Sequence, residues 1–480
     1  MTFRPAATVA AAQPEPAPAG KEAAGLARGL GLTDCTLLVV GSMVGSGIFL
    51  TSGQVAGALS SPWLILLAWA LGGGMALCGA LTYAELGASL PRAGGHYVYL
   101  REAYGPLVGF LDGWLSFIAS FPGSIAFVAL GLVAYLPSPW AGESVLGGEA
   151  FGLDLALSSN QVIAIGIVLG LSTMNALGLR AGAGTQNFLS GLKIAALVGI
   201  AGLGILWGRG EWGNFGLGEM TVTGSAGIGA ALIGVSFAYL GWDAATYMAA
   251  ETKQPQRNLP RSLALGTLVV VGLYLLFNIV LFYGVPVREM VGSDNVTVDA
   301  VTRLLGPGFA GLVSTVVLIC ILGSLNATIM VGPRIYYAMA RDGVFPSALG
   351  KVGRTTRVPV AAISAQAIWA CVIVLCATLG RILAFTVLVI WLLSAATGAA
   401  VFVLRRTRPE LARPYRVWGY PWVPAIFCVS SLLLVVNHLW STPADLLWLV
   451  GFLGLGMMIY PVLRRRGATA PQTAGPELSQ

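Results

Sequence analysis

Twelve apolar runs, each long enough to cross a bilayer, constrain this 480-residue chain more than any other feature. The hydrocarbon core of a bilayer is about 30 Å thick, which a helix of about 20 apolar residues spans. Only 10% of the residues are charged, against about 25% in ordinary soluble domains. We therefore predict an all-α integral membrane protein. Its spans are expected at 34–60, 63–89, 106–136, 160–178, 186–207, 225–250, 261–285, 306–338, 359–379, 382–404, 421–440 and 443–463.

The distribution of basic residues predicts the orientation of these spans. Loops on the cytoplasmic side of a membrane protein carry an excess of Lys and Arg. If the N-terminus lies inside, that side receives all 27 Lys and Arg residues except Arg209, Arg288, Arg303 and Arg381, which fall outside, and Lys193, which falls within a span. Both termini of this multi-pass protein are thus expected on the cytoplasmic side of the cell membrane. The same bias accounts for the net charge of +7, so no nucleic-acid partner is expected.

The chain ends and the cysteines suggest little chemistry. Residues 1–30 are rich in Ala and Pro and lack the apolar core of a signal peptide, so we expect a disordered cytoplasmic tail there and a second tail at 464–480. The six cysteines lie in or beside apolar runs without CxxC spacing, which favours buried thiols. There is no GxxxxGK[ST] phosphate loop. With only two histidines, we expect no metal, no cofactor and no enzyme active site.

Two of the runs carry residues that weaken a helix in mid-membrane. "GSMVGSGIFL" (41–50) and "GVSFAYLGWDAATYMAAE" (234–251) place glycines there, each at a cost of about 1 kcal/mol relative to alanine. Helices interrupted at corresponding positions of two halves mark the binding site of many secondary transporters. We expect breaks near Gly45–Ile48 and Ala238–Gly241. The alternative is that these small residues only allow close helix packing.

Four long segments carry a family resemblance. They are "VGSMVGSGIFLTSG" (40–53), "CGALTYAELGASLPRAGGHYVYLREAYGP" (78–106), "FAYLGWDAATYMAAETKQPQRNLPRSL" (237–263) and "GSLNATIMVGPRIYYAMARDGVFP" (323–346). In these segments the chain resembles the amino acid–polyamine–organocation superfamily, in particular its L-type amino acid transporter branch and bacterial relatives. The resemblance implies the five-plus-five inverted repeat of LeuT-type transporters, with spans one and six broken. The repeats would be 31–207 and 225–404, followed by two further helices in 421–463.

The resemblance also implies how an α-amino acid would bind. Backbone N–H groups at the start of a half-helix suit a carboxylate, and carbonyls released by unwinding suit an ammonium. The carboxylate would bind the N–H groups of Gly45, Ser46 and Gly47 and the Ser46 hydroxyl. The ammonium would bind the carbonyls of Met43, Phe237, Ala238 and Leu240.

Further residues near the breaks are assigned by the same resemblance. Phe237 would be an aromatic gate over the substrate, or else an ordinary core aromatic. Asn326 and Thr328 would lie near the substrate side chain, or else bond a neighbouring helix. Tyr239 and Trp242 are possible side-chain contacts that could equally pack in the core.

Lys193 is the most informative charge in the sequence. A lysine at the centre of a membrane helix costs about 2.5–3.5 kcal/mol to insert, so such a residue is functional by default. The resemblance implies that its ammonium takes the place of a sodium ion and braces the broken first span, which predicts sodium-independent transport. The alternative is that the side chain snorkels toward the cytoplasmic end of its span.

The acidic residues near the spans have simpler expected roles. Asp243 follows the second break, where we expect it to cap a half-helix, with contact to a cationic substrate side chain as the alternative. Glu85, Asp112 and Glu251 are expected to pair with arginines of the inner face. His96 is expected in a cytoplasmic loop.

Together these features predict a secondary amino acid transporter that works by alternating access. Neutral L-amino acids are the expected substrates, moved by exchange or proton symport. A cationic amino acid or polyamine exchanger is the alternative within the class. A channel would need a polar lumen, which the sequence does not suggest, whereas a sensor derived from a transporter stays possible. The sequence does not predict the oligomeric state or any accessory subunit.

Overall fold

The structure, a computed structural model, describes residues 26–136, 144–146, 149–150, 153–154, 157–216, 224–291, 293, 295–376 and 379–469. The expected tails therefore fall mostly outside the described residues. At the N-terminal end, the ordered chain begins before the expected boundary. The N–H groups of Gly29 and Leu30 donate to the carbonyl of Glu251, and the N–H of Lys253 donates to the carbonyl of Leu30. The last helix continues to Thr469, past the expected start of the C-terminal tail at 464.

The first half of the chain forms eight α-helices and one π-helix within the described residues. The α-helices are α1 (Leu32–Met43), α2 (Gly47–Ala58), α3 (Pro62–Ser89), α4 (His96–Tyr104), α5 (Pro106–Leu115), α6 (Phe121–Ala134), α7 (Ser159–Ala176) and α8 (Leu179–Trp207). The π-helix η1 (Ser116–Ser120) joins α5 to α6. Proline at the first position of α3 and α5 suits a helix start, because its missing N–H would have no partner there.

The second half contains the remaining helices. They are α9 (Gly224–Ala238), α10 (Ala244–Tyr247), α11 (Pro255–Gly284), α12 (Val287–Met290), α13 (Val296–Leu305), α14 (Ala310–Val331), α15 (Pro333–Arg341), α16 (Val360–Cys376), α17 (Leu379–Thr407), α18 (Trp422–Ser441) and α19 (Ala444–Thr469). Short 3₁₀-helices are η2 (Trp212–Phe215), η3 (Ala249–Glu251), η4 (Pro307–Phe309) and η5 (Ser347–Gly350).

The all-α membrane class is confirmed apart from one small feature. Each of the twelve apolar runs overlaps a helix or consecutive helices, and nine helices of the described chain are long and apolar enough to cross a membrane. The exception lies between α6 and α7, where β1 (Ser144–Leu146) pairs with β4 (Leu157–Ser158) and β2 (Glu149–Ala150) pairs with β3 (Leu153–Asp154), both antiparallel.

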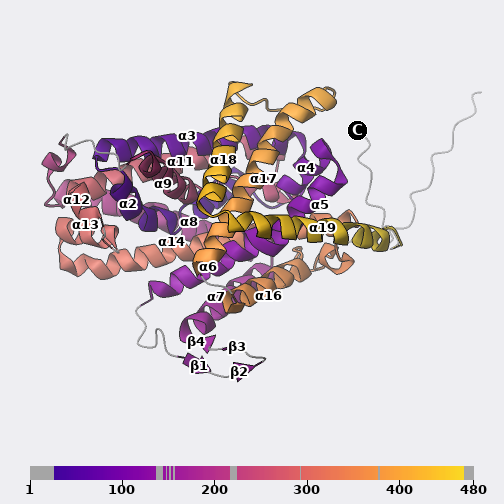
Figure 1. Cartoon of the computed structure of the whole chain (residues 1–480), viewed down its shortest axis with the longest axis horizontal. Coiled ribbons are helices and arrows are strands. Elements are labelled where there is room, and N and C mark those ends of the chain that lie inside the picture. The colour runs from indigo at the N-terminus through magenta and orange to yellow at the C-terminus, as the bar shows by residue number, and fades with distance from the viewer. Residues whose placement is uncertain are drawn as a thin grey trace, which may run out of the picture.

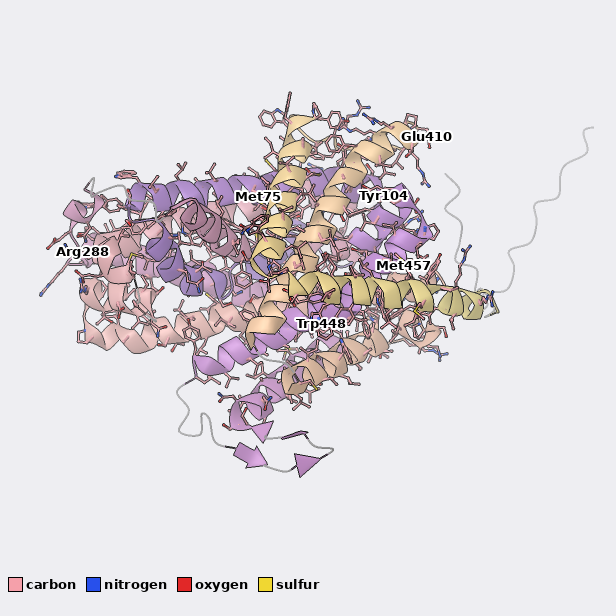
Figure 2. The ribbon with its side chains drawn as sticks, in the orientation of Figure 1. Met75, Tyr104, Arg288, Glu410, Trp448 and Met457 are labelled. Atoms are coloured by element: carbon pink, nitrogen blue, oxygen red, sulfur yellow. The ribbon has the colours of Figure 1, made fainter. Side chains whose placement is uncertain are left out.

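The helices surround a central core that contains α1. Helix α1 packs against α8, α11 and α14, and α3 packs along α11 (Figure 1). Helices α17 and α18 stand side by side against α3, while α19 lies against α5. Large apolar side chains project from α19, among them Trp448 and Met457 (Figure 2), which are 63% and 52% exposed. Such a surface suits contact with lipid.

Candidate functional site

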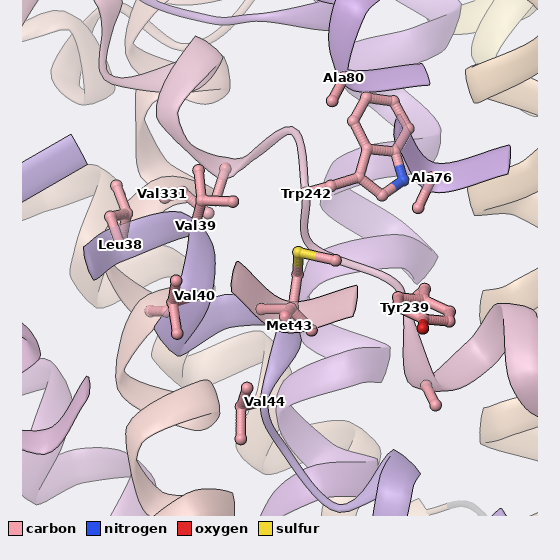
Figure 3. Close-up of a cluster of buried hydrophobic side chains, with 14 of the residues drawn as sticks. Leu38, Val39, Val40, Met43, Val44, Ala76, Ala80, Tyr239, Trp242 and Val331 are labelled. Atoms are coloured by element: carbon pink, nitrogen blue, oxygen red, sulfur yellow. The ribbon is translucent and has the colours of Figure 1, made fainter. Parts of the chain in front are cut away.

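Two interrupted helices meet at the centre of the molecule. The chain leaves the helix between Met43 and Gly47, and again between Ala238 and Ala244. The breaks expected near Gly45–Ile48 and Ala238–Gly241 are therefore confirmed, at residues 44–46 and 239–243. Figure 3 shows Met43, the last residue of α1 before the first break, between Tyr239 and Trp242 of the second.

Gly241 lets the two breaks approach closely. Its φ is +102°, a region that favours glycine, and a Cβ added there would lie 2.9 Å from the carbonyl carbon of Ser42. A side chain at this position would therefore both strain the backbone and separate the breaks.

The glycines of the first break are also packing residues. A Cβ on Gly47 would lie 2.5 Å from Ala238 Cα, and a Cβ on Gly45 would lie 2.7 Å from Ser324 Oγ. Gly41 faces side chains of α8 at similarly close range. Close packing, offered above as the alternative to a break, is thus correct at these positions, and it coexists with the break.

Lys193 bonds the end of α1. Its Nζ donates to the carbonyl oxygens of Gly41 at 2.8 Å and Val44 at 2.6 Å. A broken helix leaves such carbonyls without intrahelical partners, and a charged donor satisfies them strongly. The side chain is fully buried, so the snorkelling alternative is wrong.

Tyr274, on α11, connects the two breaks and was not predicted as a site residue. Its hydroxyl lies 2.8 Å from the carbonyl oxygen of Met43 and 3.0 Å from that of Ala238. A hydroxyl has one proton, so at any moment it donates to one of these carbonyls and leaves the other free for a further donor. The available signal was a phenol in the middle of the apolar run "GLYLLF" (272–277).

A cavity of about 150 Å³ lies against both breaks. Many of the predicted site residues line it: Met43, Gly45, Ser46, Gly47, Phe237, Ala238, Leu240, Trp242, Asp243 and Thr328. Other lining residues were not predicted, namely Ser116, Ser120 and Ser124 from η1 and α6, Ser324 from α14, Ser394 from α17, and His96 and Tyr247. The cavity thus combines interrupted backbone with several small hydroxyl side chains.

Asn326 and Tyr239 lie away from this cavity. Asn326 is fully buried, donates to Gln186 Oε1 at 2.8 Å and accepts from Asn175 Nδ2 at 2.8 Å, so it bonds neighbouring helices. The Tyr239 ring packs against Trp69 with centroids 5.8 Å apart, and its hydroxyl bonds no described residue. Phe237 lines the cavity and packs edge-on against Phe127 at 5.9 Å.

Asp243 does not cap α10, contrary to expectation. Its Oδ2 lies 2.9 Å from His96 Nε2 and accepts from the Tyr247 hydroxyl at 2.9 Å, and it makes no capping bond. His96 itself is not in a loop: it begins α4 and is 5% exposed. Gly94 and Gly95, with φ of +116° and +50°, turn the chain so that the imidazole faces inward.

The expected pairing of acidic residues with arginines is confirmed twice and wrong once. Glu85 accepts two hydrogen bonds from Arg405, at 2.8 and 2.6 Å, and Glu251 accepts two from Arg334, both at 2.9 Å. Asp112 pairs with no arginine of the described residues. It is 1% exposed, its carboxylate bonds no described residue, and its Oδ1 lies 3.8 Å from His96 Nδ1.

A separate network connects α4 to the residue that follows α17, outside the apolar spans. Glu102 accepts hydrogen bonds from Arg101 at 2.9 Å and Arg408 at 2.6 Å. Burial alone would raise the pKa of the Glu102 carboxyl, but the bonds and charges of these arginines hold it below its usual value. In the described part of the chain, no three or more His, Cys, Asp or Glu residues are grouped to hold a metal ion.

Comparison with known proteins identifies relatives over nearly the whole chain. The model of a family described as "Amino acid permease" matches residues 30–458. The serine/threonine exchanger SteT of Bacillus subtilis (strain 168) is 32% identical over 449 residues, which cover 93% of this chain and 99% of SteT. The human b(0,+)-type amino acid transporter 1 is 30% identical over 91% of this chain and 88% of its own length. The human large neutral amino acids transporter small subunit 2 is 27% identical over 93% of this chain and 81% of its own length.

Proposed function

This chain belongs to the amino acid permease family, and on that premise we propose that it exchanges neutral L-amino acids, without sodium, through the cavity between its two breaks. It is an amino acid transporter of the membrane and not an enzyme. The cavity that contacts both interrupted helices carries the proposal. It offers both kinds of backbone group that an α-amino acid needs.

The first break supplies the donors for a carboxylate. Gly45, Ser46 and Gly47 line the cavity, and within the described residues their N–H groups donate to no backbone carbonyl. Gly45 and Ser46 precede α2 and Gly47 begins it, and the N-terminus of a helix carries partial positive charge. In our proposal the carboxylate of the substrate binds these N–H groups, and its ammonium binds the carbonyls of Met43 and Ala238. The Tyr274 hydroxyl donates to the one of these two carbonyls that bonds the ammonium less closely.

The surroundings of the cavity favour a neutral substrate. Asp243 already contacts His96 and the Tyr247 hydroxyl, so its carboxylate is engaged and less suited to a cationic side chain. Serine hydroxyls on η1, α6, α14 and α17 suit a small polar side chain, and SteT is by name a serine/threonine exchanger. Serine and threonine are therefore the first substrates to test. A cationic amino acid or polyamine is the second candidate, because Asp243 still lies at the cavity wall.

The same geometry supports two further parts of the proposal, sodium independence and alternating access. The Lys193 ammonium lies where a coupling cation would brace α1, so no sodium ion is needed there. Helices α2 and α9 pack together beside the breaks, with Gly47 against Ala238, while the cavity extends to His96 and Tyr247. We place the end of the cavity at His96 and Tyr247 on the cytoplasmic side. In this proposal the protein has twelve spans in a five-plus-five arrangement, with both termini inside.

Counterflow into proteoliposomes tests the proposal. Vesicles loaded with unlabelled serine should accumulate labelled serine or threonine with saturable kinetics, equally in sodium and in choline buffers. Competition by the twenty amino acids and several amines then defines the substrate range. Uptake that does not saturate would refute a carrier, and uptake that requires sodium would refute the role given to Lys193.

A further inference from the structure

Three titratable side chains from three segments meet at the end of the cavity near α4. His96 begins α4, Asp112 lies on α5, and Asp243 lies at the end of the second break. The imidazole stands between the carboxylates, with Nδ1 3.8 Å from Asp112 Oδ1 and Nε2 2.9 Å from Asp243 Oδ2. The mechanism proposed above uses none of these three groups.

Asp112 is the unusual member of this cluster. It is 1% exposed, and neither of its carboxylate oxygens has a hydrogen-bond partner in the described chain. The distance of 3.8 Å to His96 is too long for a hydrogen bond. Burying a carboxylate without partners is very costly, so such a group is stable when it holds a proton or a cation.

The two carboxylates of the cluster carry more negative charge than His96 can balance. Even a positively charged imidazole compensates only one of Asp112 and Asp243, so the other needs a proton. The other titratable groups that face the cluster are uncharged phenols: Tyr83 from α3, Tyr99 from α4 and Tyr247 from α10.

Charged groups on the elements packed around α4 and α5 have other partners. On α15 and just after it, Arg334 bonds Glu251, and Asp342 bonds Arg101 and Tyr97. On α17, Arg405 bonds Glu85, and just after this helix Arg408 bonds Glu102. Helix α19 contributes Tyr460, whose ring contacts Phe110, and η1 contains no titratable residue. A proton on Asp112 therefore neutralises the cluster, because no other cation in the described part of the chain is placed to do so.

The cluster is connected both to the cavity and to a broken helix. His96, Asp243 and Tyr247 line the cavity, whereas Asp112 lies behind the imidazole. The contact between His96 and Asp243 joins α4 to the segment that follows the second break. Any movement of that segment changes the surroundings of the imidazole, and hence the affinity of the cluster for a proton.

We propose that His96, Asp112 and Asp243 form a proton-binding site through which this transporter moves a proton together with its substrate. The proton forms an O–H bond with a carboxylate oxygen of Asp112. For release, movement of the second break brings the imidazole of His96 from its present 3.8 Å to hydrogen-bond distance. The Asp112 O–H bond then breaks, and the imidazole takes this proton while it gives a ring proton to the cavity, so that its own protonation is unchanged. The proposal rests on the proposed function, because a proton site on the cavity wall has a transport role only if the cavity carries substrate. The proton then takes the place of sodium as the source of driving force.

Proton movement with substrate can be measured in proteoliposomes that contain a trapped pH-sensitive dye. With an inward pH gradient, serine added outside should acidify the lumen of wild-type vesicles, and a protonophore should remove the gradient's effect on uptake. Asp112→Asn should still exchange serine, but with at least tenfold less serine-dependent acidification. The matched control is Asp445→Asn, which removes another carboxylate that contacts a histidine, at 2.8 Å from His438 Nε2. This control should acidify the lumen like the wild type.

Counterflow in the same vesicles separates the two proposals. Absence of counterflow in the wild type would refute the proposed function itself. Counterflow without serine-dependent acidification in the wild type, or full acidification by Asp112→Asn, would overturn the proton site alone. If Asp112→Asn does not purify as a monodisperse protein, Asp112→Ser tests the same point outside the cavity wall, because a serine hydroxyl does not take up the proton. Acidification at the wild-type rate by that variant would overturn the proposal, and its loss with counterflow retained would support it.

Discussion

Replacing Lys193 with methionine removes the ammonium that bonds the end of α1 but keeps a side chain of similar length. Two charge-assisted hydrogen bonds are lost, to Gly41 and Val44. Bonds of this kind contribute about 1.5–3 kcal/mol each, so about 3–6 kcal/mol of local stabilisation is lost. Removing the ammonium also removes the unfavourable free energy of burying its charge, which is several kcal/mol. We therefore expect the free energy of unfolding to change by about 2 kcal/mol or less.

Transport should suffer much more than stability in this variant. Each carbonyl left without a donor costs about 1–3 kcal/mol, which favours rearrangement of the break that places the proposed N–H donors. A loss of about 1.4 kcal/mol in substrate binding already lowers affinity tenfold. We expect the initial rate of serine counterflow at limiting substrate to fall at least tenfold, in sodium and in choline alike.

The assay pairs counterflow with a thermal unfolding scan of the purified protein. Lys351→Met is the matched control, since Lys351 is an exposed lysine in the segment between η5 and α16. It should leave both measurements unchanged. Counterflow by Lys193→Met within twofold of the wild type would refute the reasoning, because the break would then hold its shape without the ammonium.

Three further substitutions test other parts of the structure. Gly47→Ala should lower both Tm and the rate of counterflow, because its Cβ would lie 2.5 Å from Ala238 Cα. The control Gly199→Ala, whose Cβ would meet open space, should be neutral or stabilising by up to about 1 kcal/mol, and equal behaviour of the two variants would contradict the packing argument. Tyr274→Phe should lower the free energy of unfolding by about 1–2 kcal/mol and raise KM for serine several-fold, and an unchanged KM would count against its position between the breaks. Glu251→Gln leaves its buried arginine partner uncompensated and should cost about 3–5 kcal/mol, so a wild-type Tm would show that the pair contributes little.

Hydropathy and glycine placement were sufficient to predict the helical membrane class and both breaks. Apolar runs of membrane length leave few alternatives, since the backbone must satisfy its own hydrogen bonds inside a bilayer. Glycines in mid-span then identified where the helices stop, at 44–46 and 239–243. The contact of Lys193 with the first break also follows from this logic, because a charge placed so deeply needs an acceptor.

Features that depend on tertiary contacts could not be predicted in this way. His96 lies in a polar segment, yet its ring is buried, after a turn in which Gly94 and Gly95 both have positive φ. Asn326 and Thr328 are two residues apart on α14, yet one bonds neighbouring helices and the other lines the cavity. Their assignment depends on the rotation of α14, which the sequence does not specify because that helix is apolar on all sides.

Recognition of the amino acid backbone by the two breaks is the central claim, and competition with altered substrates tests it most directly. The measurement is inhibition of labelled serine counterflow by serine, by its methyl ester, which lacks the carboxylate, and by the corresponding hydroxy acid, which lacks the ammonium. We predict that serine competes fully and that neither analogue competes at tenfold higher concentration. Competition by both analogues as strong as that by serine would contradict the claim, because neither break would then be binding the group assigned to it.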